Sequence, residues 1–190
     1  MFAVKRSISR GLVAVSALVA SIVVVPQASA STSASDNPVG TPFKVAASAV
    51  AETRDAVAAN PEAAAAAATV CGGGYSIILY AERLPSASNH LGTVYTYTDG
   101  RTTGPNYNDK PVCAVFHNET GSTRYMGVRL NDNYTDTPSV QDFGSFSTYA
   151  GPVYQNKGYC GTVYSYMRSS SSSTGGSVVV DASRGSTPCN

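Results

Sequence analysis

From residue 71 onward, short apolar and β-branched runs alternate with turns rich in glycine, serine and asparagine. In one run, Met126, Val128 and Leu130 recur at every second position, which is typical of a strand with one buried face. The eight runs that fit a strand are residues 75–80, 93–98, 112–116, 126–130, 143–149, 153–154, 162–167 and 178–180. Many short strands separated by turn residues predict an all-β fold, a small sandwich or barrel.

Three local features refine this pattern. Asp99-Gly100 follows an apolar run and predicts a tight hairpin turn. The hexapeptide Gly-Thr-Val-Tyr-Thr-Tyr at residues 92–97 recurs at 161–166 as Gly-Thr-Val-Tyr-Ser-Tyr. A single six-residue match does not establish a repeat architecture, and two strands built from the same β-forming residues explain it. The five serines at residues 169–173 predict a flexible loop.

The first thirty residues have the pattern of a secretory signal peptide. Lys5, Arg6 and Arg10 precede an apolar run over residues 11–25, and Ala-Ser-Ala follows at 28–30. The run is shorter than the roughly 20 residues that a membrane-spanning helix needs. We therefore expect cleavage after Ala30 and no membrane span in the mature protein, which is expected to be soluble and outside the cell.

Residues 31–70 form an alanine-rich region with little apolar bulk. One interpretation is a flexible linker or propeptide that is trimmed or disordered, because small side chains offer little surface for docking. The other is two short helices, at about 45–59 and 61–70. In that case Asn60 caps the second helix and Pro61 takes its first position, where proline is tolerated.

Charge excludes one class of partner. The 190 residues carry a formal net charge of +1, and loss of the signal peptide leaves ten basic side chains against twelve acidic ones. Nucleic-acid binding requires a concentrated basic patch, so no nucleic-acid partner is expected.

The predicted all-β domain spans residues 71–190 and contains all four cysteines, Cys71, Cys113, Cys160 and Cys189. In an exported domain, four cysteines imply two disulfides. No C-x-x-C pair occurs, which disfavours a zinc site. Three pairings are possible. We favour Cys71–Cys113 with Cys160–Cys189, because sequential bridges close the shortest loops.

All 12 tyrosines also lie in these 120 residues, and there is no tryptophan. Tyrosine offers a large contact area at a low cost in side-chain entropy and is favoured at half-exposed sites. Tyr95, Tyr97, Tyr164 and Tyr166 therefore form a candidate binding surface. The alternative is that several tyrosines fill the core, since bulky aliphatic residues are few.

No catalytic motif occurs, and neither a catalytic nor a cofactor-binding residue is assigned. An arginine, His117 and either Glu82 or Glu119 would suit the acid–base chemistry of a small secreted ribonuclease. Acidic residues scattered one per loop do not single out a glycosidase pair. The oxygen-rich cluster at residues 131–136 fails the calcium-loop rule twice, at Thr137 and Phe143, so we expect a surface turn and no metal or cofactor.

The order of motifs resembles spore-associated protein A and its relatives, small secreted proteins of filamentous actinobacteria. The resemblance rests on Cys-Gly-Gly-Gly-Tyr at 71–75, Tyr-Ala-Gly-Pro-Val at 149–153 and the order of the four cysteines. The family usually has Trp-Gly-Gly after the third cysteine, where this chain has Thr-Val-Tyr at 162–164, so the chain resembles a divergent member.

The resemblance implies association with spores or aerial structures and carries over no catalytic residue. The expected function is that of a secreted, non-enzymatic surface protein with partners among spore or cell-wall components. A small secreted hydrolase of RNA or glycans is the first alternative. The second is a secreted inhibitor or ligand-binding module that uses the loop near 168–177.

Overall fold

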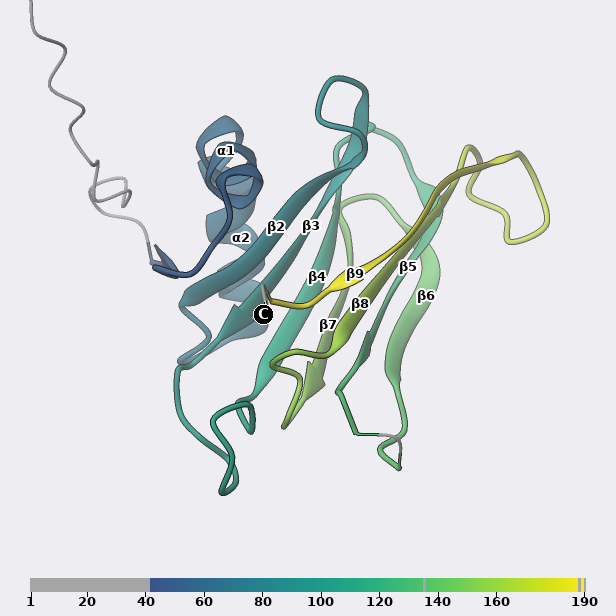
Figure 1. Cartoon of the computed structure of the whole chain (residues 1–190). Coiled ribbons are helices and arrows are strands. Elements are labelled where there is room, and N and C mark those ends of the chain that lie inside the picture. Colours follow the sequence, from purple (N-terminus) through teal and green to yellow (C-terminus); the bar gives the residue numbers. More distant parts are fainter. Residues whose placement is uncertain (1–41, 135, 188, 190) are drawn as a thin grey trace, which may run out of the picture. The chain divides into compact units, whose positions relative to one another are not determined.

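The computed structural model describes residues 42–134, 136–187 and 189. The elements in this part of the chain are β1 (Lys44–Val45), α1 (Ala51–Ala59), α2 (Pro61–Cys71), β2 (Ile77–Pro85), β3 (His90–Thr98), β4 (Val112–Asn118), β5 (Arg124–Asn131), β6 (Val140–Phe146), β7 (Tyr149–Gln155), β8 (Thr162–Arg168) and β9 (Val178–Gly185). They form one sheet in the order β1-β2-β3-β4-β7 and a second in the order β6-β5-β8-β9 (Figure 1). The predicted all-β fold is confirmed, in its sandwich form.

The core between the two sheets is built from alternate positions of their strands. On β5, Met126, Val128 and Leu130 are completely buried. Val94 and Phe116 lie in the same cluster and come from the five-stranded sheet. Successive side chains of a strand point to opposite faces, so the period of two seen in the sequence selects this buried face.

The two alanine-rich helices cover the other face of the five-stranded sheet (Figure 1). Ala64 and Ala67 of α2 are buried in one cluster with Tyr95 and Tyr97 of β3. The Tyr97 hydroxyl donates a hydrogen bond to the Ala64 carbonyl oxygen at 2.6 Å. Alanine lets the helix approach the sheet closely, and the tyrosines supply the apolar volume that the helix lacks.

These helices correct the expectation of a flexible stalk over the described part of residues 31–70. The apolar surface for docking comes from the sheet, so small helical side chains are sufficient. Residues 1–41, including the expected signal peptide, lie outside the described residues. Removal of residues 31–70 as a propeptide stays a prediction.

The boundary between the helices follows the predicted capping chemistry. Asn60 accepts a hydrogen bond through its side-chain oxygen from the Ala63 backbone N–H at 3.1 Å, and Pro61 begins α2. The first helix is shorter than expected. It begins at Ala51, and Val45, where the helix was predicted to begin, belongs to β1, which pairs in parallel with β2.

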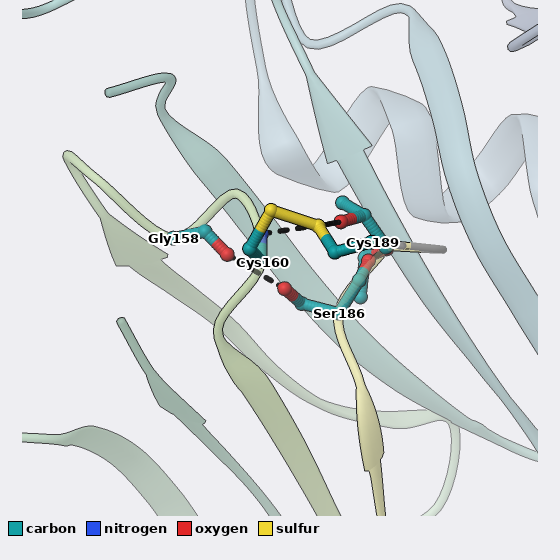
Figure 2. Close-up of a disulfide and its surroundings, with 6 residues drawn as sticks. Gly158, Cys160, Ser186 and Cys189 are labelled. Carbon is teal, nitrogen blue, oxygen red and sulfur yellow. Dashed lines mark hydrogen bonds between the residues drawn. A yellow bond between two sulfur atoms is a disulfide. The ribbon is translucent and has the colours of Figure 1, made fainter. Parts of the chain in front are cut away.

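Both disulfides have the pairing that the sequence favoured. Cys71–Cys113 joins the end of α2 to β4, so it anchors the helical layer to the sheet. Cys160–Cys189 joins the β7–β8 connection to the segment after β9 (Figure 2). Beside it, the Ser186 hydroxyl donates to the Gly158 carbonyl oxygen at 2.6 Å.

The expected hairpin at Asp99-Gly100 is wrong. Strands β3 and β4 do pair in antiparallel fashion, but the long connection over residues 99–111 separates them. The buried carboxylate of Asp109 organises this connection by accepting hydrogen bonds from the Tyr134 hydroxyl and, at 3.1 Å, from the Asn106 backbone N–H. The predicted strand at 143–149 is likewise divided, because β6 and β7 belong to different sheets.

We predict that Ala64→Leu lowers the free energy of unfolding by roughly 1–3 kcal/mol, because no space remains for added methylenes between α2 and the sheet. The matched control is Ala66→Leu, which lies on the same helix and is exposed, and its effect is expected to stay within about 0.5 kcal/mol. Urea unfolding of the two variants measures both values. Equal, negligible effects would mean that the helices do not pack on the sheet.

Candidate functional site

The repeated hexapeptide places tyrosines on the outer face of both sheets. Residues 92–97 lie in β3, and residues 161–166 lie in and just before β8. Val94 and Val163 point into the core between the sheets, so the alternating tyrosines point away from it. On β3 these tyrosines meet the helices, whereas no helix of the described residues covers β8 (Figure 1).

The four tyrosines of the expected binding surface therefore do not lie together. Tyr95 and Tyr97 are 0% exposed and belong to the core beneath the helices. For these two residues the alternative prediction, that some tyrosines fill the core, is correct. Tyr164 and Tyr166 are half-buried on the outer side of the four-stranded sheet. Of the four tyrosines, only this second pair is partly accessible.

Two more rings join this pair to form what we call the aromatic face: Tyr125, Phe143, Tyr164 and Tyr166. The ring centroids of Phe143, Tyr164 and Tyr166 are 6.3–6.4 Å apart. Tyr125 meets Tyr166 edge-on, with centroids 6.4 Å apart. All four rings are half-buried, so they form a continuous and partly accessible aromatic surface across β6, β5 and β8.

Gly127 makes this arrangement possible. It lies directly between Phe143 on β6 and Tyr166 on β8 in the register of the sheet. A Cβ atom at this position would lie 2.2 Å from the Phe143 ring, closer than any side chain permits. The absence of a side chain therefore lets Phe143 reach across β5 to the tyrosines.

Polar groups hold the rings in place. The Arg129 guanidinium lies 4.7 Å from the centre of the Tyr164 ring, within the range of a cation–π contact. Arg168 donates a hydrogen bond to the Tyr166 hydroxyl at 2.9 Å. Burial, followed by the hydrogen bond to the Asp181 carboxylate, raises the pKa of Tyr164 to about 12, so its hydroxyl remains a donor at neutral pH.

The serine-rich loop, which the sequence predicts to be flexible, borders the aromatic face and is attached to it by hydrogen bonds. Arg168 donates to the carbonyl oxygens of Gly175 and Gly176, each at 2.7 Å. The Ser169 backbone N–H donates to the Ser177 carbonyl oxygen at 2.9 Å. Ser145, on the outer side of β6, donates to the carbonyl oxygen of Ser171 in this loop, which fixes the loop next to the rings.

Of the two remaining members of this face, the sequence contained the signal for Tyr125 only. The alternation that buries Met126 and Val128 necessarily turns Tyr125 and Arg129 to the opposite side. The position of Phe143 could not be predicted, because its partner strand and register were unknown.

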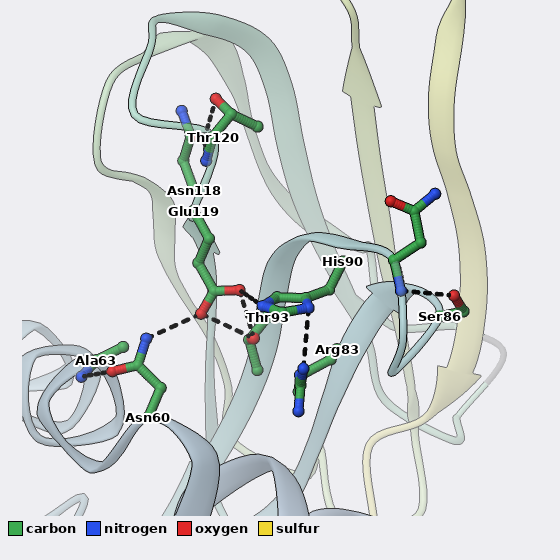
Figure 3. A network of polar contacts seen from close by, with 10 residues as sticks. Asn60, Ala63, Arg83, Ser86, His90, Thr93, Asn118, Glu119 and Thr120 are labelled. Carbon is green, nitrogen blue, oxygen red and sulfur yellow. Dashed lines mark hydrogen bonds and ion pairs between the residues drawn. The ribbon is translucent and has the colours of Figure 1, made fainter.

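A polar cluster around Glu119 is the second candidate site (Figure 3). Glu119 follows β4, and its carboxylate accepts hydrogen bonds from the Asn60 side-chain amide at 3.0 Å and from the Thr93 hydroxyl at 3.1 Å. His90 Nε2 lies 3.5 Å from the second carboxylate oxygen. These contacts link the start of α2 to β3 and β4, so the cluster stabilises the helical layer.

The partners of His90 determine its tautomer. Arg83 Nη2 lies 3.0 Å from His90 Nδ1, and a guanidinium only donates hydrogen bonds. Nδ1 is therefore the acceptor, and Nε2 carries the hydrogen that faces Glu119. With both ring nitrogens engaged, His90 has no free nitrogen for proton transfer to a substrate.

His117 lies near this cluster, next to Thr93 in the register of the sheet. Its Nδ1 atom is buried, and burial lowers the pKa of the ring. Within the described residues, the Tyr95 hydroxyl, Arg83 Nε and His117 Nδ1 have no hydrogen-bond partner. Of the two acids considered for catalysis, Glu119 lies near these groups, whereas Glu82 pairs with Arg184 at 2.8 Å.

The oxygen-rich segment at 131–136 forms a turn as far as it is described, in which Asp132 accepts a hydrogen bond from the Tyr134 backbone N–H at 2.9 Å. Across residues 42–134, 136–187 and 189, no group of three or more histidine, cysteine, aspartate or glutamate side chains is placed to hold a metal ion. The Asp132 side chain therefore bonds the backbone two residues further on, which is the arrangement of an Asx turn.

Neither a protein-family model, nor a curated protein, nor a solved structure matches this chain.

Glu119→Gln is expected to lower the free energy of unfolding by roughly 1–3 kcal/mol, because the new amide places a donor against groups that themselves donate. Asp136→Asn removes the same charge from an exposed position and serves as the control. Thermal or urea unfolding compares the two. Indistinguishable stabilities would mean that the Glu119 cluster does not hold the helices.

Proposed function

We propose that this protein is an extracellular, non-enzymatic binding protein that attaches to a cell or spore surface through its aromatic face. One observation carries the proposal. The same tyrosine pattern occurs on both sheets, yet helices cover it only on β3, while Tyr164 and Tyr166 remain partly accessible. Clusters of accessible aromatic side chains are typical of interaction sites.

Two further features support the extracellular part of the proposal. Both disulfides are formed, and such bonds persist mainly in oxidising compartments. The first thirty residues have the pattern of a secretory signal peptide. Neither helix of the described residues is both long and apolar enough to cross a membrane.

The spore surface is favoured by the resemblance to spore-associated protein A. The motifs that carry it, at residues 71–75 and 149–153, lie close together in the fold, since the Tyr154 hydroxyl directly after the second motif donates to the Cys71 carbonyl oxygen at 3.0 Å. Members of that family are small secreted proteins associated with spores or aerial structures, so partners among spore or cell-wall components are part of this proposal.

The proposal is tested by locating a tagged full-length protein in cells, spores and medium. We expect the parent protein in the cell or spore fraction and the double variant Tyr164→Leu/Tyr166→Leu in the medium, since leucine keeps apolar packing but removes the flat ring. The control is Tyr107→Leu, which changes a tyrosine that is 72% exposed outside the aromatic face. A parent protein found only in the medium would contradict the surface role.

A small secreted hydrolase is the second candidate function, and a specific observation favours it. Arg83, His117 and Glu119 converge at one end of β2, β3 and β4 as a cation, a base and an acid, and His117 Nδ1 has no hydrogen-bond partner among the described residues. Against it, hydrogen bonds already occupy the Glu119 carboxylate.

The hydrolase is tested with the mature chain on RNA and on soluble glycans, alongside Glu119→Gln and His117→Gln. Assays are run below the unfolding temperature of each variant. If this candidate is right, the parent protein turns over one substrate class and each variant loses roughly 100-fold or more in rate. No turnover by the parent protein eliminates it.

A further inference from the structure

We propose that the aromatic face binds an uncharged polysaccharide, with sugar rings against the aromatic rings and sugar hydroxyls against the serine-rich loop. This inference rests on the proposed surface-binding function and specifies its ligand. Three properties of the face lead to it: its side-chain composition, its charge and the way its rings are held.

The composition suits sugars better than a protein partner. The outer positions of β5, β6 and β8, set by the register of the sheet, contain no leucine, isoleucine, valine or methionine. They combine aromatic rings with amide and hydroxyl groups, such as Gln141, Asn131 and Thr162. Stable interfaces between copies of one protein are more apolar than this.

A pyranose ring matches the composition because it is itself amphipathic. Its hydroxyls radiate around the rim, while at least one face presents mainly C–H groups. Those C–H groups pack against the electron-rich faces of aromatic rings. The rim hydroxyls both donate and accept hydrogen bonds, as amides and hydroxyls of a protein also do.

The serine-rich loop supplies a hydroxyl-bearing wall beside the rings. Ser171, Ser172, Ser173 and Thr174 are exposed. Ser145 and Arg168 fix the loop next to Phe143 and Tyr166 through the hydrogen bonds described above. A ligand lying on the rings would therefore meet a row of hydroxyl groups at one border of the aromatic face.

The charges favour an uncharged ligand. Strands β5, β6, β8 and β9 contain no lysine. Arg124, Arg168 and Arg184 are engaged by backbone oxygens or by a carboxylate. Arg129 is the remaining arginine of these strands, and the carboxylate of Asp181 offsets its charge on the same face. An anionic polymer requires several free cations, and this surface does not provide them.

The rings are also pre-ordered, which favours binding of a repetitive polymer. Gly127 leaves room for Phe143, the Arg129 guanidinium lies against the Tyr164 ring, and Arg168 holds Tyr166. Side chains that are already fixed lose little conformational entropy when a ligand is bound. Affinity can then come from several weak ring contacts along one chain.

The experiment is co-sedimentation of the mature protein with insoluble chitin and cellulose, together with affinity electrophoresis in a soluble neutral β-glucan. We expect retention on at least one neutral polysaccharide, little changed at 1 M salt because no charge pairing is involved. Tyr164→Leu/Tyr166→Leu should weaken retention by about tenfold or more, and Tyr107→Leu should retain parental binding.

Parallel binding assays with alginate, with single-stranded DNA and with the protein alone test whether the aromatic face instead binds an anionic polymer or a second copy of the protein. A preference for alginate or DNA that disappears with salt, or self-association lost in the double variant without polysaccharide binding, overturns the inference. Unchanged binding by a folded Tyr164→Leu/Tyr166→Leu also overturns it. If that variant leaves the cell surface while the parent protein binds no neutral polysaccharide, the surface role stands and the polysaccharide ligand is wrong.

A second variant, outside the aromatic face, separates loss of binding from loss of folding. Ser172→Ala/Ser173→Ala removes two exposed hydroxyl groups of the loop without touching a buried side chain. It is expected to reduce retention on the neutral polysaccharide several-fold. Full retention by this variant would exclude the loop from the site.

Discussion

The packing of two alanine-rich helices onto Tyr95 and Tyr97 is the contact on which the rest of the structure depends. Alanine side chains alone are too small to fill a core, and two tyrosines on the face of a sheet are exposed to solvent unless another element packs on them. The tyrosines supply apolar volume, and the helices shield the tyrosines from water. The hydrogen bond from Tyr97 to the Ala64 carbonyl oxygen satisfies a hydroxyl that burial would otherwise leave without a partner. The Cys71–Cys113 disulfide and the Glu119 cluster secure the two ends of α2.

This cover gives the two faces of the sandwich different roles. One tyrosine-bearing face becomes a second core, and the other keeps its rings partly accessible beside a hydroxyl-rich loop. The hexapeptide at 92–97 and 161–166 is therefore the same strand pattern in two environments. What surrounds a tyrosine, more than its local sequence, decides whether it is buried in a core or stays partly accessible.

Much of the fold could be predicted from local sequence because local rules determine it. The alternation of apolar and polar residues identified the buried face of β5, and the capping preference of asparagine and proline predicted the helix boundary at Asn60–Pro61. The short sequence separation of the paired cysteines favoured the correct disulfides. The docking of the helices could not be predicted, since it depends on residues far along the chain, such as Tyr97, which lies 33 positions after its partner Ala64. For the same reason, the candidate site was only half identified: Tyr164 and Tyr166 were named, but the contribution of Phe143 requires the register across Gly127.

The central claim is that one tyrosine face is sealed and the other meets a partner. Hydroxyl-radical footprinting with mass spectrometry, on free protein and on protein bound to its cell or spore surface, tests it most directly. We expect Tyr95 and Tyr97 to stay unmodified in both states, and Tyr164 and Tyr166 to be modified in the free protein and protected in the bound one. Modification of Tyr95 and Tyr97 in the free protein, or unchanged labelling of Tyr164 and Tyr166 on binding, would contradict the account.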